Sequence, residues 1–438
     1  MNKLTTTLLI ALLLLIGLTG SPVQGQQSPS PKGSFLLLGA VAHLGNGQVI
    51  ENSAIGVRDG RFTLVADATV IRINPAEYDT VITGTGQHVY PGFIAAVSGL
   101  GLIEIGAVRA TNDASEVGDY NPHIRSSIAF NTDSKVLPTL RNNGILIAQV
   151  IPSGGTISGF SSVVHLNGWN WEDALMAEDD ALHLHWQQLL SREGWWVENA
   201  RLESNEKYHT NTDKLYAFFE EARAYAQNPS PAPVNLRFEA MKGIFDGSKK
   251  VFIRCYEAKE IAEAVRFGEA FGLDYVLVDA GQAWQVTDLL KQYDVPVILE
   301  QTHRLPPYGH SDVDQPFKTP ALLKAAGVRF GLSVGSGWDA FWQTRNLSYH
   351  AGQAVPFGLD PEVAVASITG NLAEILGLEA RCGTLTSGLE ATFLLSEGDV
   401  LDMRTSRITH AWIQGQAVDL DDHQRVLYRR YMSKYGLE

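Results

Sequence analysis

The stretch KVFIRCYEAKEIAEAVRFGEAFGLDYVLVDAGQAWQVTDLLKQYDVPVILEQ, residues 250–301, alternates apolar strands with helical segments. Apolar runs at 250–256, 274–280 and 295–301 are separated by segments that carry apolar residues at helical spacing. Such runs are typical of parallel strands that helices bury on both faces. Further runs at 144–151 and 328–334 extend the pattern. The region is long enough for a (β/α)-barrel, which usually needs about 250 residues. We therefore predict an α/β fold.

A second sequence pattern, typical of short strands and turns, occurs at both ends of the chain. Residues 34–90 contain Asn46-Gly47 and Asp59-Gly60, which are strong hairpin signals because glycine accepts a positive φ. A similar strand-rich stretch returns at residues 381–420. We therefore predict a small β-sandwich domain built from both chain ends, with the barrel inserted at 91–380. An amphipathic helix is expected at residues 421–438.

Composition excludes some classes of function. The chain has 438 residues, 45% of them hydrophobic and 19% charged, which is ordinary for a globular protein. Its formal net charge of −14, with no long basic run, argues against nucleic acid as a partner. Two cysteines, Cys255 and Cys382, are too few for a disulfide framework and are expected to be buried apolar residues.

The N-terminus has the pattern of a secretory signal. Lys3 precedes the apolar run LLIALLLLIGL at 8–18, and small and polar residues follow it. A membrane-spanning helix would need about 20 apolar residues, so an uncleaved anchor is the weaker alternative. We predict a signal peptide at 1–25, a flexible lead-in at 26–33, and export, most simply to a periplasm. No other segment of the sequence is expected to cross a membrane.

Four stretches resemble one known family. They are VRDGRFTLVA (57–66), PGFI (91–94), PEVAVASITGNLAEILGL (361–378) and GTLTSGLEATFLL (383–395). The chain resembles the amidohydrolase superfamily, in particular its exported imidazolonepropionase-like branch, from about residue 34 to 420. The resemblance implies a TIM-like barrel and hydrolysis of non-peptide carbon–nitrogen bonds in cyclic or linear amides. It also implies one or two divalent metal ions such as zinc, which would activate a water molecule.

The metal-ligand positions that the resemblance implies hold other residues here. The H-x-H of the first barrel strand is replaced by Val97 and Gly99, and the fifth-strand positions hold Arg254 and Tyr256. The sixth strand has Ala280 in place of a histidine, and the eighth has Gly335 in place of an aspartate. Valine, glycine and alanine offer no lone pair, and arginine repels a cation. The sequence predicts that the family's metal site is absent and no cofactor is assigned. The fourth-strand ligand is not placed.

Two other motifs each allow two interpretations. The literal His183-Leu184-His185 could bind a metal, but it follows an acidic run and is better explained as an amphipathic surface or excursion segment. The glycine-rich segment 154–159 could cradle an anion through backbone N–H groups, although a tight strand-to-loop transition is favoured.

Loops that follow barrel strands supply the candidate pocket residues, because barrel active sites are built at the carboxyl ends of the strands. The loop 101–124 could bind a hard cation or form an acid–base pair, or its polar residues could only bond locally. Arg254, Asp339 and Arg345 could pair with one another or bind a ligand. The full candidate set is Glu104, Arg109, Asp113, Asp119, Arg254, Tyr256, Asp279, Glu300, His303, Trp338 and Asp339.

Two functions from different classes remain open. In one, the protein is a hydrolase that uses relocated carboxylates, such as Glu104, Asp113 and Asp119, or a metal-free acid–base pair. In the other, it is a non-catalytic periplasmic ligand-binding or partner subunit in which Arg254 and Tyr256 fill the metal position. The metal positions favour the second hypothesis. An amide-like small molecule is the expected ligand, and a homo-oligomer or a hetero-oligomer with a related amidohydrolase is the expected assembly.

Overall fold

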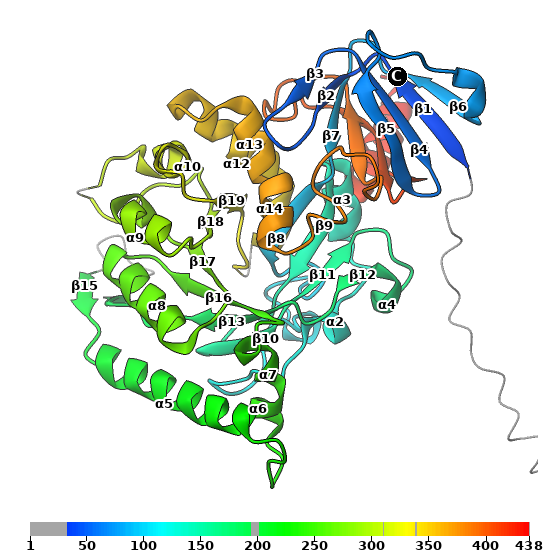
Figure 1. Cartoon of the computed structure of the whole chain (residues 1–438). Helices are drawn as coiled ribbons and strands as arrows, with labels where there is room; N and C mark the ends of the chain where they lie inside the picture. The colour runs from blue at the N-terminus through cyan, green and yellow to red at the C-terminus, as the bar shows by residue number, and fades with distance from the viewer. Residues whose placement is uncertain (1–32, 194–200, 310, 338–339, 438) are drawn as a thin grey trace, which may run out of the picture. The chain divides into compact units, whose positions relative to one another are not determined.

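A barrel of strands forms the centre of the fold in the computed structural model (Figure 1). The structure describes residues 33–193, 201–309, 311–337 and 340–437. The predicted signal peptide, lead-in residues 26–32, Trp338 and Asp339 therefore lie outside the described residues. Across the described ranges, no helix combines the length and apolarity needed to span a membrane.

Eight strand positions make up the barrel wall in the described part of the chain. In chain order they are β8 (Phe93–Ser98), β9 (Ile145–Val150), the consecutive β10 (Ile157–Phe160) and β11 (Ser162–His165), β13 (Ala181–His185), β16 (Lys250–Cys255), β17 (Tyr275–Asp279), β18 (Val297–Glu300) and β19 (Phe330–Ser333). Strand β19 lies beside β8, where the Ser333 hydroxyl donates to the Ala96 carbonyl oxygen at 2.6 Å. This contact closes the barrel.

The third strand position departs from the parallel arrangement that the sequence pattern predicts. Strands β8 and β9 are parallel, as are β13, β16, β17, β18 and β19 in succession. In contrast, β11 is antiparallel to β9 and β10 is antiparallel to β13. The reason is the short connection 151–156, because a parallel return needs a crossover of about a dozen residues or more.

Helices and short strands surround the barrel (Figure 1). The helices are α2 (Ser126–Ala129), α3 (Val136–Asn142), α4 (Trp171–Ala174), α5 (Tyr208–Gln227), α6 (Leu236–Ala240), α7 (Lys242–Phe245), α8 (Ala258–Phe271), α9 (Thr287–Gln292), α10 (Gln315–Ala326), α11 (Ala340–Gln343), α12 (Leu347–Ala354), α13 (Pro361–Ser367), α14 (Gly370–Ile375) and α15 (His423–Tyr435). Strand β12 (Leu175–Ala177) pairs with β11, and β14 (Leu190–Glu193) pairs with β15 (Arg201–Ser204).

The barrel interior is apolar at one end and polar at the other. Ile94, Phe252 and Val276 are buried in one cluster with Leu372 and Ile375 of α14, which pack at the amino ends of the strands. Toward the carboxyl ends, the buried or half-buried side chains are polar: Gln149, His183, His185, Arg254, Glu300 and Ser333. The chemistry that the barrel can support is therefore at the carboxyl ends of its strands.

The β-sandwich combines strands from both chain ends. One sheet has the order β5 (Arg61–Asp67), β4 (Ser53–Arg58), β1 (Ser34–Leu38) and β6 (Thr80–Thr83). The other has the order β22 (Gln416–Ala417), β21 (Ile408–Ile413), β20 (Phe393–Ser396), β7 (His88–Pro91), β2 (Val41–His43) and β3 (Val49–Ile50). The join between the ends is the antiparallel pair β20–β7. The predicted fold class, a barrel with a sandwich from both ends, is confirmed.

Candidate ligand-binding site

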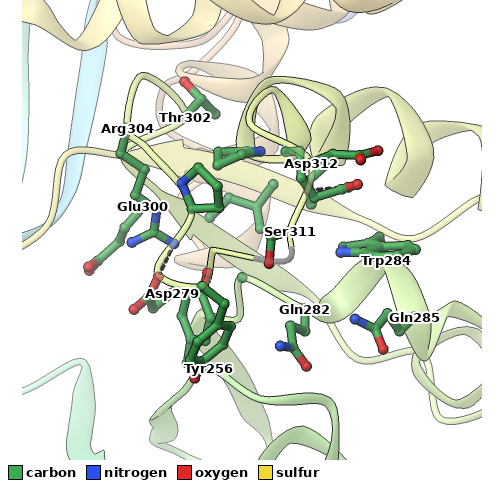
Figure 2. A pocket seen from close by; sticks show the side chains of 17 residues that line it. Tyr256, Asp279, Gln282, Trp284, Gln285, Glu300, Thr302, Arg304, Ser311 and Asp312 are labelled. Carbon is green, nitrogen blue, oxygen red and sulfur yellow. Dashed lines mark hydrogen bonds and ion pairs between the residues drawn. The ribbon is translucent and has the colours of Figure 1, made fainter. Parts of the chain in front are cut away.

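A cavity of about 310 Å³ lies above the carboxyl ends of β16, β17 and β18 (Figure 2). Its wall includes Tyr256, Asp279, Trp284, Glu300, Arg304 and Asp312. Three of these, Tyr256, Asp279 and Glu300, end or directly follow a barrel strand, as expected for a barrel site. In Figure 2, Tyr256, Asp279 and Arg304 form one side of the cavity and Trp284 the other. The volume is at the lower end of the range for small-molecule pockets.

Arg254 and Glu300 form a bidentate ion pair at the base of this region. The two guanidinium nitrogens Nη1 and Nη2 each donate to one carboxylate oxygen of Glu300, both at 2.6 Å. The Glu300 side chain is only 9% exposed. Burial alone would lower the pKa of Arg254, but the attraction of Glu300 outweighs it and raises that pKa above its ordinary value. Each group therefore satisfies the hydrogen-bonding atoms of the other.

A second ion pair lies beside the first and faces the cavity. Arg304 Nη2 donates to Asp279 Oδ1 at 2.8 Å, and the guanidinium carbon lies 5.2 Å from the centre of the Tyr256 ring. Burial raises the pKa of Asp279, and the charge of Arg304 opposes that rise. Within the described residues, the buried Nε of Arg304 has no hydrogen-bond partner. Arg304 also lines the cavity, so its guanidinium can serve as a donor to a ligand there.

Local backbone contacts fix Tyr256. The Glu260 carboxylate, in the first turn of α8, accepts from the backbone N–H groups of Tyr256 and Glu257 at 2.9 and 3.1 Å. Gly281 makes room for the ring, since a Cβ there would lie 2.2 Å from Tyr256 Cε2. These two features hold the tyrosine against Arg304.

The backbone is strained at three strand ends around the same site. Val97, Asp279, Ala280 and Gln301 have φ values of 53°, 67°, 43° and 47°. Positive φ is uncommon outside glycine, and for a β-branched residue such as valine it is a true outlier. Such strain tends to be concentrated at functional sites. The strained ends of β8, β17 and β18 therefore support a site at this end of the barrel.

The residues present do not fit the divalent ions that the family resemblance implies. Val97 and Ala280 offer no ligand atom, and Arg254 places a cation at a fifth-strand position. A Cβ on Gly335 would lie 2.7 Å from Glu300 Oε2, so an aspartate there would collide with the ion pair. The described ranges also contain no cluster of three or more His, Cys, Asp or Glu side chains arranged to hold a metal ion.

His183 and His185 correct one prediction and fill the missing fourth-strand position. They lie on β13, a barrel strand, where His185 pairs in register with Arg254 of β16. The prediction of a surface segment is wrong, because the polar pair faces the barrel interior. Burial, and next the charge of Arg254, lowers the pKa of His185 to about 4. Burial also lowers the pKa of His183 well below its ordinary value. Both imidazoles are neutral at pH 7.

The residues of the loop after β8 lie away from the cavity. Arg109, Asp113 and Asp119 are exposed, and Glu104 lines a separate groove. Asp119 accepts from the backbone N–H and the hydroxyl of Thr156 at 2.8 and 3.0 Å, which matches the local-bonding interpretation. These contacts also fix the glycine-rich segment 154–159, which leads from the loop after β9 into β10.

The remaining candidates are divided between several places. His303 is exposed, and its backbone N–H donates to His350 Nδ1 at 3.2 Å. Arg345 lies 5.7 Å from the Trp342 ring, in the separate groove, while Arg254 pairs with Glu300. Arg254 and Arg345 thus lie in different places, and Asp339, the third member of that candidate set, lies outside the described residues. Sequence reasoning missed Arg304 and Trp284. Arg304 could have been identified from its position four residues after Glu300, in the loop that follows a barrel strand.

We expect the substitution Gly335→Ala to lower the free energy of unfolding by about 1–3 kcal/mol. The residue has φ +93°, and its new Cβ would crowd the Glu300 carboxylate. Gly86→Ala is the matched control, because Gly86 has φ +77° and nothing lies within 4 Å of the point that its Cβ would occupy. Urea unfolding of both variants separates the cost of placing alanine at a positive φ, which both share, from the cost of crowding Glu300, which only Gly335→Ala has. Equal losses in the two variants would show that the space beside Glu300 is not restricted.

Solved structures of amidohydrolases resemble this chain over most of its length. An amidohydrolase from Thermotoga maritima MSB8 matches 88% of this chain and 99% of its own, with a TM-score of 0.74 and 19% identity. An adenosine deaminase from Xanthomonas campestris with bound zinc matches 93% of this chain and 99% of its own, with a TM-score of 0.54 and 15% identity. A putative prolidase from Bifidobacterium longum matches 93% of this chain and 99% of its own, with a TM-score of 0.52 and 16% identity.

At the level of sequence, no protein-family model matches the chain and no curated protein matches it. Likenesses at 15–19% identity concern the fold. The barrel, the sandwich shared by both chain ends and these structural matches together establish that the chain has the amidohydrolase fold.

Proposed function

We propose that this protein is a non-hydrolysing ligand-binding member of the amidohydrolase fold that acts after export. The observation that carries the proposal is the buried Arg254–Glu300 pair, which occupies the space where the resemblance would place metal ligands. A guanidinium fixed there cannot activate water as a metal ion does. The exported location rests on the apolar run at residues 8–18.

The neighbouring carboxylates support binding rather than hydrolysis. A general base must be free to accept a proton from water. Glu300 accepts two charge-assisted hydrogen bonds from Arg254, and Asp279 accepts one from Arg304. Each carboxylate is thereby bonded to a guanidinium that competes for its oxygen atoms. Both groups are better suited to positioning Arg254 and Arg304 than to proton transfer.

The cavity suggests the chemistry of the ligand. Arg304 offers donors to a carboxylate or an amide carbonyl oxygen, and Trp284 offers an aromatic face across the cavity (Figure 2). Gln282 and Gln285 line the same space and can exchange hydrogen bonds with an amide. We propose a small planar ligand that carries a carboxylate or amide group.

We expect Arg304→Met to weaken binding of such a ligand roughly 10- to 100-fold, since a hydrogen bond to a charged group contributes about 1.5–3 kcal/mol. A thermal-shift screen of small carboxylates and amides would supply the ligand, and calorimetry would measure its affinity. Arg329→Met is the matched control, because Arg329 forms ion pairs with Asp294 and Glu374 outside the cavity.

Two results would overturn the proposal. One is that Arg304→Met leaves the affinity for the ligand unchanged while Arg329→Met reduces that affinity. The other is saturable hydrolysis of an amide by wild-type protein, purified without chelators, that holds one equivalent of zinc or manganese per chain.

A further inference from the structure

A cluster of titratable side chains lies where the β-sandwich meets the barrel helices. His43 of β2 and His88 of β7 belong to the sandwich, while Glu362 belongs to α13, which comes after the last barrel strand. His43 Nδ1 lies 2.7 Å from Glu362 Oε1, and His43 Nε2 lies 3.1 Å from His88 Nδ1. The side chains of His43 and Glu362 are 14% and 18% exposed. These three residues, the junction cluster, therefore form one chain of hydrogen bonds across the junction.

The positions of the protons in this chain follow from the carboxylate at its end. A carboxylate only accepts, so His43 Nδ1 donates to Glu362, and Nε2 of a neutral His43 must then accept. His88 Nδ1 consequently donates to His43 Nε2. One added proton keeps every bond, because one of the two facing nitrogens is still free to accept. With two added protons, N–H groups oppose each other where the nitrogens are 3.1 Å apart, and the bond between the rings is lost.

The surroundings of His88 favour the state with the fewer protons. Three carboxylates act on its ring and favour protonation, those of Glu51, Glu362 and Asp399. Burial, and next the charge of His43, outweigh this attraction and lower the pKa of His88 below its ordinary value. The unfolded chain therefore protonates His88 at a higher pH than the folded chain. The contribution of the ring-to-ring bond to stability is complete above about pH 6.5 and decreases as the pH falls below that value.

Packing at the junction leaves little room for the two rings to move apart. Tyr90 stacks on His43, with ring centres 4.3 Å apart and planes inclined by 5°. Burial raises the pKa of Tyr90, so this ring stays neutral in acid. Two residues after His43, the sandwich backbone meets the start of α14, where a Cβ on Gly370 would lie 2.2 Å from the Gly45 carbonyl oxygen. Repulsion between the rings therefore has to displace β2 and β7 from the helices.

We propose that the junction cluster is a pH-sensitive contact between the β-sandwich and α13, closed with no or one added proton on its two imidazoles and open with two. In the open state β2 and β7 separate locally from α13, while the pairing of β7 with β20 holds the sandwich together. The first barrel strand is affected next, because Ile368, directly after α13, accepts from the backbone N–H of Ile94 in β8 at 2.9 Å. The contact is separate from the cavity above β16, β17 and β18.

Hydrogen exchange of the full chain, followed by mass spectrometry, tests this contact segment by segment. Between pH 7.5 and 5, the protection of β2, β7 and α13 is expected to fall roughly tenfold more than that of β17, after correction for intrinsic exchange rates. His88→Asn is expected to remove this difference, because the asparagine amide still donates to His43 but cannot take up a proton. His410→Asn is the matched control and should behave as wild type, since His410 is exposed on β21 of the same sheet.

Exchange of the imidazole C2 hydrogens in wild type shows the pH at which His43 and His88 become protonated, and it does not depend on whether a variant folds. The two protons are expected to bind in separate steps, because interacting groups titrate as a pair. Loss of protection should coincide with the second step. Three results would overturn the proposal: a loss that coincides with the first step, wild-type protection of β2, β7 and α13 that parallels that of β17 at every pH, or the same loss in His88→Asn as in wild type.

Discussion

Replacing Glu300 by glutamine is expected to lower the free energy of unfolding by about 3–5 kcal/mol, which is the usual loss when one partner of a buried ion pair is removed. Glu300 is 9% exposed, and both of its oxygen atoms accept from Arg254 at 2.6 Å. Glutamine would keep the shape of the side chain but would leave the buried guanidinium without its counter-charge. The loss would arise from that uncompensated charge rather than from a cavity.

Urea unfolding of three proteins tests this interpretation. The double variant Arg254→Met/Glu300→Leu is expected to recover most of the stability lost in Glu300→Gln, because it removes both charges and keeps apolar volume. Arg407→Met is the control. Arg407 and Glu397 form an exposed pair at 3.1 Å, and loss of such a pair changes stability by about 1 kcal/mol or less. A loss below that value in Glu300→Gln would show that the pair is not buried in solution.

The sequence predicted the architecture where each strand had a regular pattern. The apolar runs at 250–256, 274–280 and 295–301 correspond to β16, β17 and β18, and the strand-rich chain ends form the sandwich. Strand β13 was missed because His183 and His185 interrupt its apolar pattern. A buried neutral histidine cannot be distinguished from a surface one by its type alone. The antiparallel β10 and β11 were missed because strand direction depends on the connection, not on the strand residues.

The site was predictable as a set of residues but not as a set of pairs. Arg254 and Tyr256 were identified because the family resemblance places metal ligands at these positions, and Asp279 and Glu300 lie at the ends of barrel strands. Their partners depend on the register between strands, which sets Arg254 beside His185 and Glu300 beside Ser333. Single-sequence patterns contain no information on that register. Whether Arg254 would pair with Glu300 or with Asp339 was therefore not decidable before the strands were aligned.

The second large effect concerns pH. Burial lowers the pKa of His185 to about 4 and that of His350 to about 4, compared with 6.5 for an ordinary histidine. The unfolded chain therefore binds these protons at a higher pH than the folded chain. The contribution of each neutral imidazole to stability is complete above about pH 7 and decreases as the pH falls from 6.5 toward 4. For each histidine the loss is roughly 3 kcal/mol.

The variant His185→Gln isolates one of these contributions. Asp180 acts in the opposite direction, because burial raises the pKa of its carboxyl to about 6, so that folding takes up a proton as the pH falls through that value. The pH dependence of wild type alone is thus a sum of opposing effects. The contribution of Asp180 is the same in wild type and in His185→Gln, so it cancels when their free energies of unfolding are subtracted. Wild type should lose roughly 3 kcal/mol more than the variant between pH 7.5 and 4.

Unfolding by urea at pH 7.5, 6, 5 and 4 measures this difference, and His123→Gln in the exposed loop after β8 is the control. The control should parallel wild type at every pH. Parallel curves for wild type and His185→Gln would contradict the burial of His185 beside Arg254. Because the charge of Arg254 also lowers the pKa of His185, the test additionally reports on the site itself. Burial is the larger cause of the low pKa of His185 and the charge of Arg254 the second, so the measurement tests the packing of this end of the barrel first and the position of Arg254 second.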